Sequence, residues 1–200
     1  AELLNSAVGL AVQEVGKQKK RITMNSGAAA SRLTGSDCSP YGVHWTYDTY
    51  ALSNGTGKAM VKQGGDTWYF LTADYAFGKN LEKDTTTVVK ANGGKVLGSV
   101  LHPLSSSDFS GYLLQAQASK AKVIGLANAG GDTINSVKQA NEFGITQGGQ
   151  KLAGLLVFDT DIDSIGLPIA QGMYLTTGFY WDLNDDSRKW AKRFGERHKC

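Results

Sequence analysis

The chain has 200 residues, of which 41% are hydrophobic and 20% are charged, and its formal net charge is +3. Such a chain can bury a substantial core in one large or two small domains. The charge is too small to indicate binding to nucleic acid. No apolar run approaches the ~18 residues of a membrane span, so we expect no direct insertion into a membrane.

The apolar patterns predict alternating strands and helices along most of the chain. Continuous apolar strands that alternate with helical patterns favour a parallel sheet covered on both faces, an α/β fold. In such sheets ligands bind beyond the carboxyl ends of the strands. In chain order, the predicted elements are helix 6–19, strand 21–25, helix 47–62, strand 67–72, helix 79–91, strand 95–100, a helix from about 107, strand 122–126, helix 133–143, strand 151–158, strand 172–177 and helix 185–199.

The first helix is predicted from three valines at helical spacing, Val8, Val12 and Val15. Ser6 can cap its first turn, since a serine hydroxyl accepts a hydrogen bond from an unpaired amide there. The regular pattern breaks near 45–48 and again near 178–182, where aromatic residues stand beside an aspartate. We interpret both places as crossings between two lobes.

The sequence contains no convincing set of catalytic or metal-binding residues. The three histidines are isolated, and no G-x-G-x-x-G motif occurs, so we expect neither a metal nor a cofactor. His102 stands near Ser105–Ser107, but no G-x-S-x-G elbow is present, so we expect no enzyme. Cys38 and Cys200 permit a disulfide without requiring one. These features favour a protein that holds a small molecule without transforming it.

Five short motifs occur in an order that resembles one family. They are Asn-Ser-Gly-Ala-Ala at 25–29, Ala-Asp-Tyr-Ala-Phe-Gly at 73–78, Ser-Asp-Phe-Ser at 107–110, Ala-Asn-Ala-Gly-Gly-Asp at 127–132 and Phe-Tyr-Trp-Asp at 179–182. The chain resembles the periplasmic solute-binding proteins of branched-chain-amino-acid-type ABC importers, in particular their aromatic-carboxylate-binding branch. The resemblance implies periplasmic capture of a small carboxylate, delivery to a membrane permease, and no enzymatic activity.

The resemblance also implies a two-lobe type I periplasmic-binding-protein fold with doubly wound, mainly parallel sheets. Residues 1–46 and 178–200 would belong to lobe one, and residues 47–177 to lobe two. Compared with a full-length member, the chain looks like an internal fragment in which lobe one is incomplete. We therefore expect residues 1–200 alone to bind a ligand poorly.

In lobe one, the resemblance assigns the ligand carboxylate to Ser6 and to the loop of Gly27, Ala28 and Ala29. A helix N-terminus attracts an anion, and small side chains let a ligand approach the backbone. The alternatives are that Ser6 is only a helix cap and that the loop is only a tight turn. Ala29 stands where amino-acid-binding members usually have a threonine, so an aromatic acid or aryl keto acid is expected rather than leucine.

In lobe two, the resemblance points to Tyr75, Phe77 and the region of Asp159, and the chemistry of the loop residues adds Asn128. Tyr75 and Phe77 stand where the family places an aromatic ring against its ligand, although Phe77 can equally anchor the following helix. Asn128 suits a phenol or keto oxygen because its amide both donates and accepts hydrogen bonds; alternatively it forms an Asx turn. The family's acidic partner for an ammonium group would fall near Asp159 or Thr160; alternatively, Asp159 is a solvated turn residue.

Two other functions remain open at this point. The same fold serves as the ligand-sensing domain of receptors and regulators, and the family also contains branched-chain amino acid binders. Neither can be separated from aromatic-acid transport by the residues alone.

Overall fold

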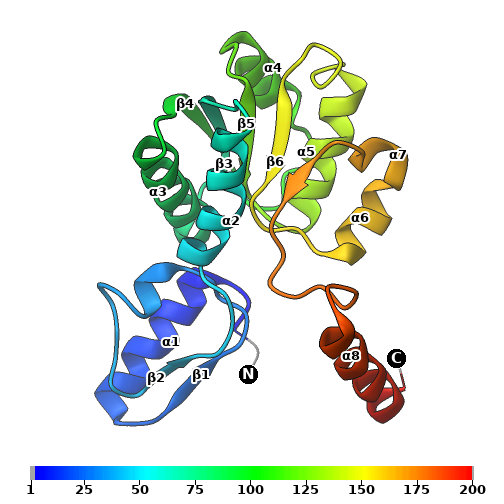
Figure 1. Ribbon diagram of the computed structural model, residues 1–200. Coiled ribbons are helices and arrows are strands. Elements are labelled where there is room, and N and C mark those ends of the chain that lie inside the picture. The colour runs from blue at the N-terminus through cyan, green and yellow to red at the C-terminus, as the bar shows by residue number, and fades with distance from the viewer. Residues whose placement is uncertain (1–2, 200) are drawn as a thin grey trace.

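The computed structural model describes residues 3–199 and contains two parallel sheets, joined by a short crossing (Figure 1). The small body consists of the two-stranded sheet and the helices beside it. Its elements are α1 (Ser6–Lys19), β1 (Thr23–Asn25), the 3-10 turn η1 (Ser31–Leu33) and β2 (Gly42–His44).

The large body is built on the five-stranded sheet, with strand order β4-β3-β5-β6-β7 and every neighbouring pair parallel. A last helix, α8 (Asp185–His198), follows it. The elements of the large body are α2 (Thr49–Lys62), β3 (Thr67–Ala73), α3 (Ala76–Ala91), β4 (Lys95–His102), α4 (Ser110–Ala118), β5 (Val123–Ala127), α5 (Gly131–Glu142), β6 (Lys151–Gly154), α6 (Asp159–Ile165), α7 (Leu167–Ala170) and β7 (Tyr174–Leu175).

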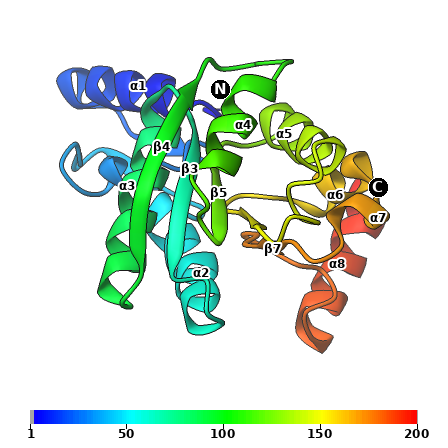
Figure 2. The ribbon, with the colours of Figure 1, turned by 90° about the horizontal axis from the view of Figure 1, so that it is seen from above.

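Two apolar clusters cover the two faces of the large sheet, because successive side chains of a strand point to opposite faces. On β3, Trp68 and Phe70 face α2 and α3, whereas Leu71 faces α4 and α5. Figure 2 shows these helices on either side of the sheet. Burial of a side chain such as Phe70, which is fully buried, contributes about 1.5–3 kcal/mol. The predicted α/β layering is confirmed.

The first helix has the predicted range, but its buried face differs from the valine stripe. Val8, Val12 and Val15 are exposed at 51%, 36% and 56%, whereas Gly9 and Gly16 are buried. A Cβ atom on Gly9 would stand 2.8 Å from the Cβ of Ala28, and one on Gly16 would collide with Thr23, so the helix packs through its glycines against β1 and the loop that follows it.

Several predicted boundaries were wrong in detail. Asn5, and not Ser6, caps α1, since its Oδ1 accepts hydrogen bonds from two amides of the first turn. The strand predicted over 151–158 ends at Gly154, although the apolar run after it stays buried. The segment between the predicted strand 21–25 and the predicted helix 47–62 contains η1 and β2, and the segment after 158 contains two short helices; the patterns revealed none of these elements.

The two chain segments interpreted as crossings lie beside each other. A Cβ atom on Gly178 would stand 2.7 Å from Cε1 of Tyr47. Two turns into α2, the hydroxyls of Thr56 and Thr176 are 2.6 Å apart. In Figure 1 the chain leaves the small body and enters α2 next to the segment that leads from β7 to α8.

Candidate ligand-binding site

The topological switch point of the large sheet lies between β3 and β5. The chain passes from β3 to β4 on one side and then to β5 on the other side, so the loops that follow β3 and β5 diverge. A crevice at the carboxyl ends of such strands is the usual place for a ligand. Tyr75 follows β3 and Asn128 follows β5, so the fold brings both residues to this point.

Tyr75 is the half-buried residue that directly precedes α3. Its ring centroid is 5.9 Å from that of Phe77. Burial raises the pKa of the Tyr75 phenol to about 12, and the negative charge of Asp132 adds to the shift. The phenol is therefore protonated at neutral pH and can donate a hydrogen bond to a ligand oxygen.

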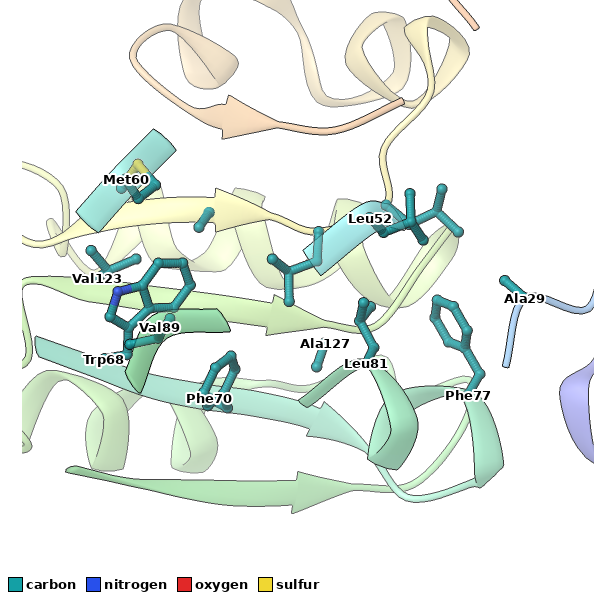
Figure 3. Close-up of a cluster of buried hydrophobic side chains, with 13 residues drawn as sticks. Ala29, Leu52, Met60, Trp68, Phe70, Phe77, Leu81, Val89, Val123 and Ala127 are labelled. Atoms are coloured by element: carbon teal, nitrogen blue, oxygen red, sulfur yellow. The ribbon is translucent and has the colours of Figure 1, made fainter. Parts of the chain in front are cut away.

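Phe77 lies in the first turn of α3 and is only 3% exposed. It belongs to the apolar cluster between the large sheet and helices α2 and α3, and Figure 3 shows its ring at one end of that cluster. Packing against the helix pair accounts for its position. A contact with a ligand at this residue stays a prediction.

Asn128 is fully buried and already has two side-chain partners. Its Oδ1 accepts a hydrogen bond of 2.7 Å from the Thr133 hydroxyl, and its Nδ2 lies 3.3 Å from Nε2 of His102. The other ring nitrogen of His102 lies 2.8 Å from the carbonyl oxygen of Pro103. The Pro103 carbonyl can only accept, so it favours the His102 tautomer that carries the proton on Nδ1. In that tautomer Nε2 accepts a hydrogen bond from the Asn128 side-chain amide. The Asn128 side chain therefore links β4 to α5 and is not held by an Asx turn.

Ser6 begins α1 and is 1% exposed. Its Oγ accepts a hydrogen bond of 3.2 Å from the amide of Ala30. A hydroxyl that accepts in this way keeps its own proton for donation. Ser6 thus combines a tie to the loop after β1 with a hydroxyl proton that a carboxylate could accept.

The loop of Gly27, Ala28 and Ala29 is held by a residue that the sequence patterns did not single out, Asn25. Its Oδ1 accepts from the Ala28 amide at 3.1 Å, and its Nδ2 donates to the Ala28 carbonyl at 2.7 Å. The asparagine directly after a strand and before Ser-Gly is the signal that could have indicated this role. Among residues 3–199, no group accepts a hydrogen bond from the Ala29 amide.

The loop of the small body touches the large body next to the aromatic residues. Ala29 is 2% exposed and belongs to the same apolar cluster as Phe77 and Leu52, at the end of the cluster shown in Figure 3. Its carbonyl accepts a 2.7 Å hydrogen bond from the Thr49 amide, at the start of α2. Tyr75 packs against this cluster as well. Predicted residues from both bodies therefore meet here.

Asp159 is the exposed member of the predicted set. It begins α6 rather than occupying a turn, and its Oδ1 accepts from the amide of Thr160 at 3.0 Å. Asp161 lies two residues further along in the same first turn and accepts from the Phe158 amide at 2.9 Å. These contacts explain the acidic residues as stabilisers of a helix N-terminus. Within residues 3–199, no group of three acidic, histidine or cysteine side chains is arranged to hold a metal ion.

The chain belongs to a family of periplasmic binding proteins, because the family profile matches residues 1–199. It is 58% identical to a periplasmic binding protein from Burkholderia mallei, with a TM-score of 0.92 over 98% of this chain and 52% of that one. It is 35% identical to a branched-chain amino acid ABC transporter periplasmic ligand-binding protein from Burkholderia xenovorans, with a TM-score of 0.85 over 100% of this chain and 53% of that one.

Two further similarities bear on the fold. A solute-binding protein of an ABC transporter from R. palustris, solved in complex with benzoate, has a TM-score of 0.85 over 98% of this chain and 54% of that one, at 21% identity. A Leu/Ile/Val-binding protein homologue from Brucella abortus is 25% identical over 92% of this chain and 43% of its own length. The expected type I fold is confirmed, and the chain spans about half the length of these relatives.

Proposed function

We propose that the protein binds a small carboxylate outside the cytoplasm, preferably an aromatic acid or aryl keto acid, and delivers it to the permease of an ABC importer. The small body and α8 belong to lobe one in this proposal, and the large body is lobe two. The observation that carries it is the meeting of Ala29 with Phe77 and Tyr75, beside the switch point. Within residues 3–199, no helix is long and apolar enough to cross a membrane.

Two kinds of group would hold such a ligand. The carboxylate would accept hydrogen bonds from the Ser6 hydroxyl and the Ala29 amide, near the N-terminal end of α1. The aromatic ring would pack near Tyr75 and Phe77, and offset or edge-to-face ring pairs contribute about 0.5–1.5 kcal/mol beyond burial. The Ala29 side chain is buried among apolar groups, so an ammonium group there would lose its hydration without gaining a partner.

The experiment is a thermal-shift screen of the full-length protein, followed by calorimetry, with benzoates, cinnamates, aryl keto acids and branched-chain amino acids. We expect the melting temperature to rise with the concentration of one aromatic class, as mass action requires. Matched pairs such as 4-methylpentanoate and leucine separate the effect of the ammonium group. A protein that no member of the panel stabilises would contradict the proposal.

Branched-chain amino acid binding is the second candidate, because relatives carry that function in their names. Stabilisation by leucine or isoleucine in preference to the aromatic acids would favour it. In that case the partner of the ammonium group would have to lie elsewhere than at Ala29, and Asp159 would be the first residue to replace.

A further inference from the structure

A carboxylate on α3 joins three separate parts of the chain. Oδ2 of Asp84 accepts a hydrogen bond of 2.8 Å from the Ser31 hydroxyl and one of 2.6 Å from the Thr49 hydroxyl. Ser31 lies in the small body, Thr49 begins α2 directly after the crossing, and Asp84 lies in the large body. Hydrogen bonds to an ionised acceptor are stronger than those between neutral groups, so this oxygen ties the two bodies to the crossing.

The same contacts continue to the loop of the candidate site. The Thr49 hydroxyl accepts a 3.0 Å hydrogen bond from the Ser31 amide while it donates to Asp84. The Thr49 amide donates to the carbonyl of Ala29 at 2.7 Å. Thr49 is fully buried, so its orientation is fixed by these partners. Asp84 therefore acts on the loop of residues 27–29 through Thr49 and Ser31.

The other end of the connection is the aromatic side of the site. Phe77, Leu81 and Asp84 are spaced four and three residues apart, which places them on one face of α3. Phe77 and Leu81 are both buried in the cluster that contains Ala29. Helix α3 thus carries both Phe77 and, two turns later, Asp84. The first residue forms the aromatic side of the site, and the second holds the loop of residues 27–29 on the other side.

We infer that Asp84 is a positioning residue for ligand binding. It holds the loop of residues 27–29 at a fixed place relative to Tyr75 and Phe77, so that the two sides of the site are already arranged when the ligand arrives. Preorganisation of this kind improves affinity because less ordering is needed on binding. The inference rests on the proposed function for its ligand, but the arrangement itself can be measured without one.

The test compares three variants of the full-length protein. Asp84→Leu removes the acceptor at similar size, whereas Asp84→Asn keeps a carbonyl oxygen that can accept from both hydroxyls. The matched control is Thr85→Val. It removes the 2.9 Å hydrogen bond between the hydroxyls of Thr85 and Ser53, which joins α3 to α2. Ser53 touches Thr49 only through the carbonyl of that residue, at 2.6 Å, so the hydrogen bonds of the Thr49 hydroxyl and amide to Asp84, Ser31 and Ala29 stay in place.

Two quantities are measured for each variant. The first is the Kd of the best-binding carboxylate of the panel, by calorimetry well below the melting temperature. The second is the distance distribution between the two bodies without ligand, by pulsed electron paramagnetic resonance. Spin labels are placed on Cys38, which is exposed in the small body, and on Lys90→Cys, an exposed position on α3. Cys200→Ser removes the other cysteine of the 200 residues.

We expect Asp84→Leu to raise the Kd at least tenfold and to broaden the distance distribution. Asp84→Asn and Thr85→Val should keep the Kd within threefold and the distribution narrow. An unchanged Kd or an unchanged distribution in Asp84→Leu would overturn the inference, as would an equal rise of the Kd in Thr85→Val. If the wild-type protein binds no carboxylate, the proposed function fails, and the distance distribution alone decides whether Asp84 positions the loop.

Discussion

Ser6 can serve two partners at once, because a hydroxyl both accepts and donates hydrogen bonds. In the structure its oxygen accepts from the Ala30 amide and so steadies the chain directly after residues 27–29. Its proton is what a ligand carboxylate would use. The side chain therefore influences binding in two ways, by direct contact and by the position of the loop.

Replacement of this side chain tests the lobe-one half of the site. We expect Ser6→Ala to weaken the binding of the preferred carboxylate at least tenfold, or about 1.4 kcal/mol, because the hydroxyl and the tie to Ala30 are lost together. The measurement is calorimetry of the full-length protein. Ser36→Ala, an exposed serine of the small body, is the control. A Kd that equals that of the wild type would remove Ser6 from the site.

The Tyr75 phenol provides a prediction about pH that needs no ligand. Burial raises its pKa from 10 to about 12, so between pH 10 and 12 the unfolded chain loses this proton before the folded chain does. The free energy of unfolding should therefore fall as the pH rises through this window. In Tyr75→Phe the fall should be smaller.

Absorbance titration measures the same group directly. The difference in phenolate absorbance between the wild type and Tyr75→Phe should titrate near pH 12 in the folded protein. In denaturant the same difference should return to the ordinary value near 10. A difference centred at pH 10 in both conditions would mean that the phenol is not held in an apolar environment.

At the scale of single elements, glycine decides where helices lie. The amphipathic pattern predicted the range of α1 but not its buried face, because the helix approaches β1 at Gly16 and the loop after β1 at Gly9. A helix face that packs through glycines carries no apolar side chains, so hydrophobic periodicity does not identify it as the buried face. The valines that revealed the helix are therefore not the residues that hold it in place.

The start of α3 depends on a glycine in the same way. A Cβ atom on Gly78 would collide with the backbone oxygen of Ala73 and would stand 2.9 Å from that of Ala127. We expect Gly78→Ala to lower the free energy of unfolding by about 1–3 kcal/mol, in the range of other overpacking changes. It should also weaken ligand binding, because Tyr75 and Phe77 move with the helix end.

Urea unfolding followed by circular dichroism measures the first effect. Gly111→Ala in α4 is the matched control, since a Cβ atom there meets nothing within 4 Å. It should leave stability unchanged or increase it slightly, because alanine loses less backbone freedom on folding. Equal stability of the two variants would show that α3 can shift away from the strand ends at no cost.

At the scale of the whole molecule, the layers of the fold could be predicted from the sequence, whereas the contacts between the two bodies could not. Apolar strands such as β5 and the stop after α3 at Gly93 follow from local patterns. The roles of Asn25 and Asp84 do not, because their partners are decided by the fold. Asp84 meets Ser31, 53 residues away, and no local pattern reports such a pair. For the same reason the lobe assignment of the crossings stays a prediction.

The contact between the crossings suggests how the two bodies could move relative to each other. Gly178 lies against the ring of Tyr47, so a methyl group on Gly178 would push the two segments apart. Periplasmic binding proteins close around a ligand by hinge motion between their two lobes. We therefore expect Gly178→Ala to disfavour the closed form and to raise the Kd of the ligand several-fold, while the stability of the large body changes little.

Small-angle scattering of the full-length protein, with and without saturating ligand, would measure the closure. The variant should show a smaller decrease in radius of gyration than the wild type. Tyr47→Ala removes the ring that the new methyl group meets, so the double variant should bind better than the sum of the two single changes predicts. Strict additivity would mean that the two crossings act independently, and the hinge would then have to lie at some other part of the chain.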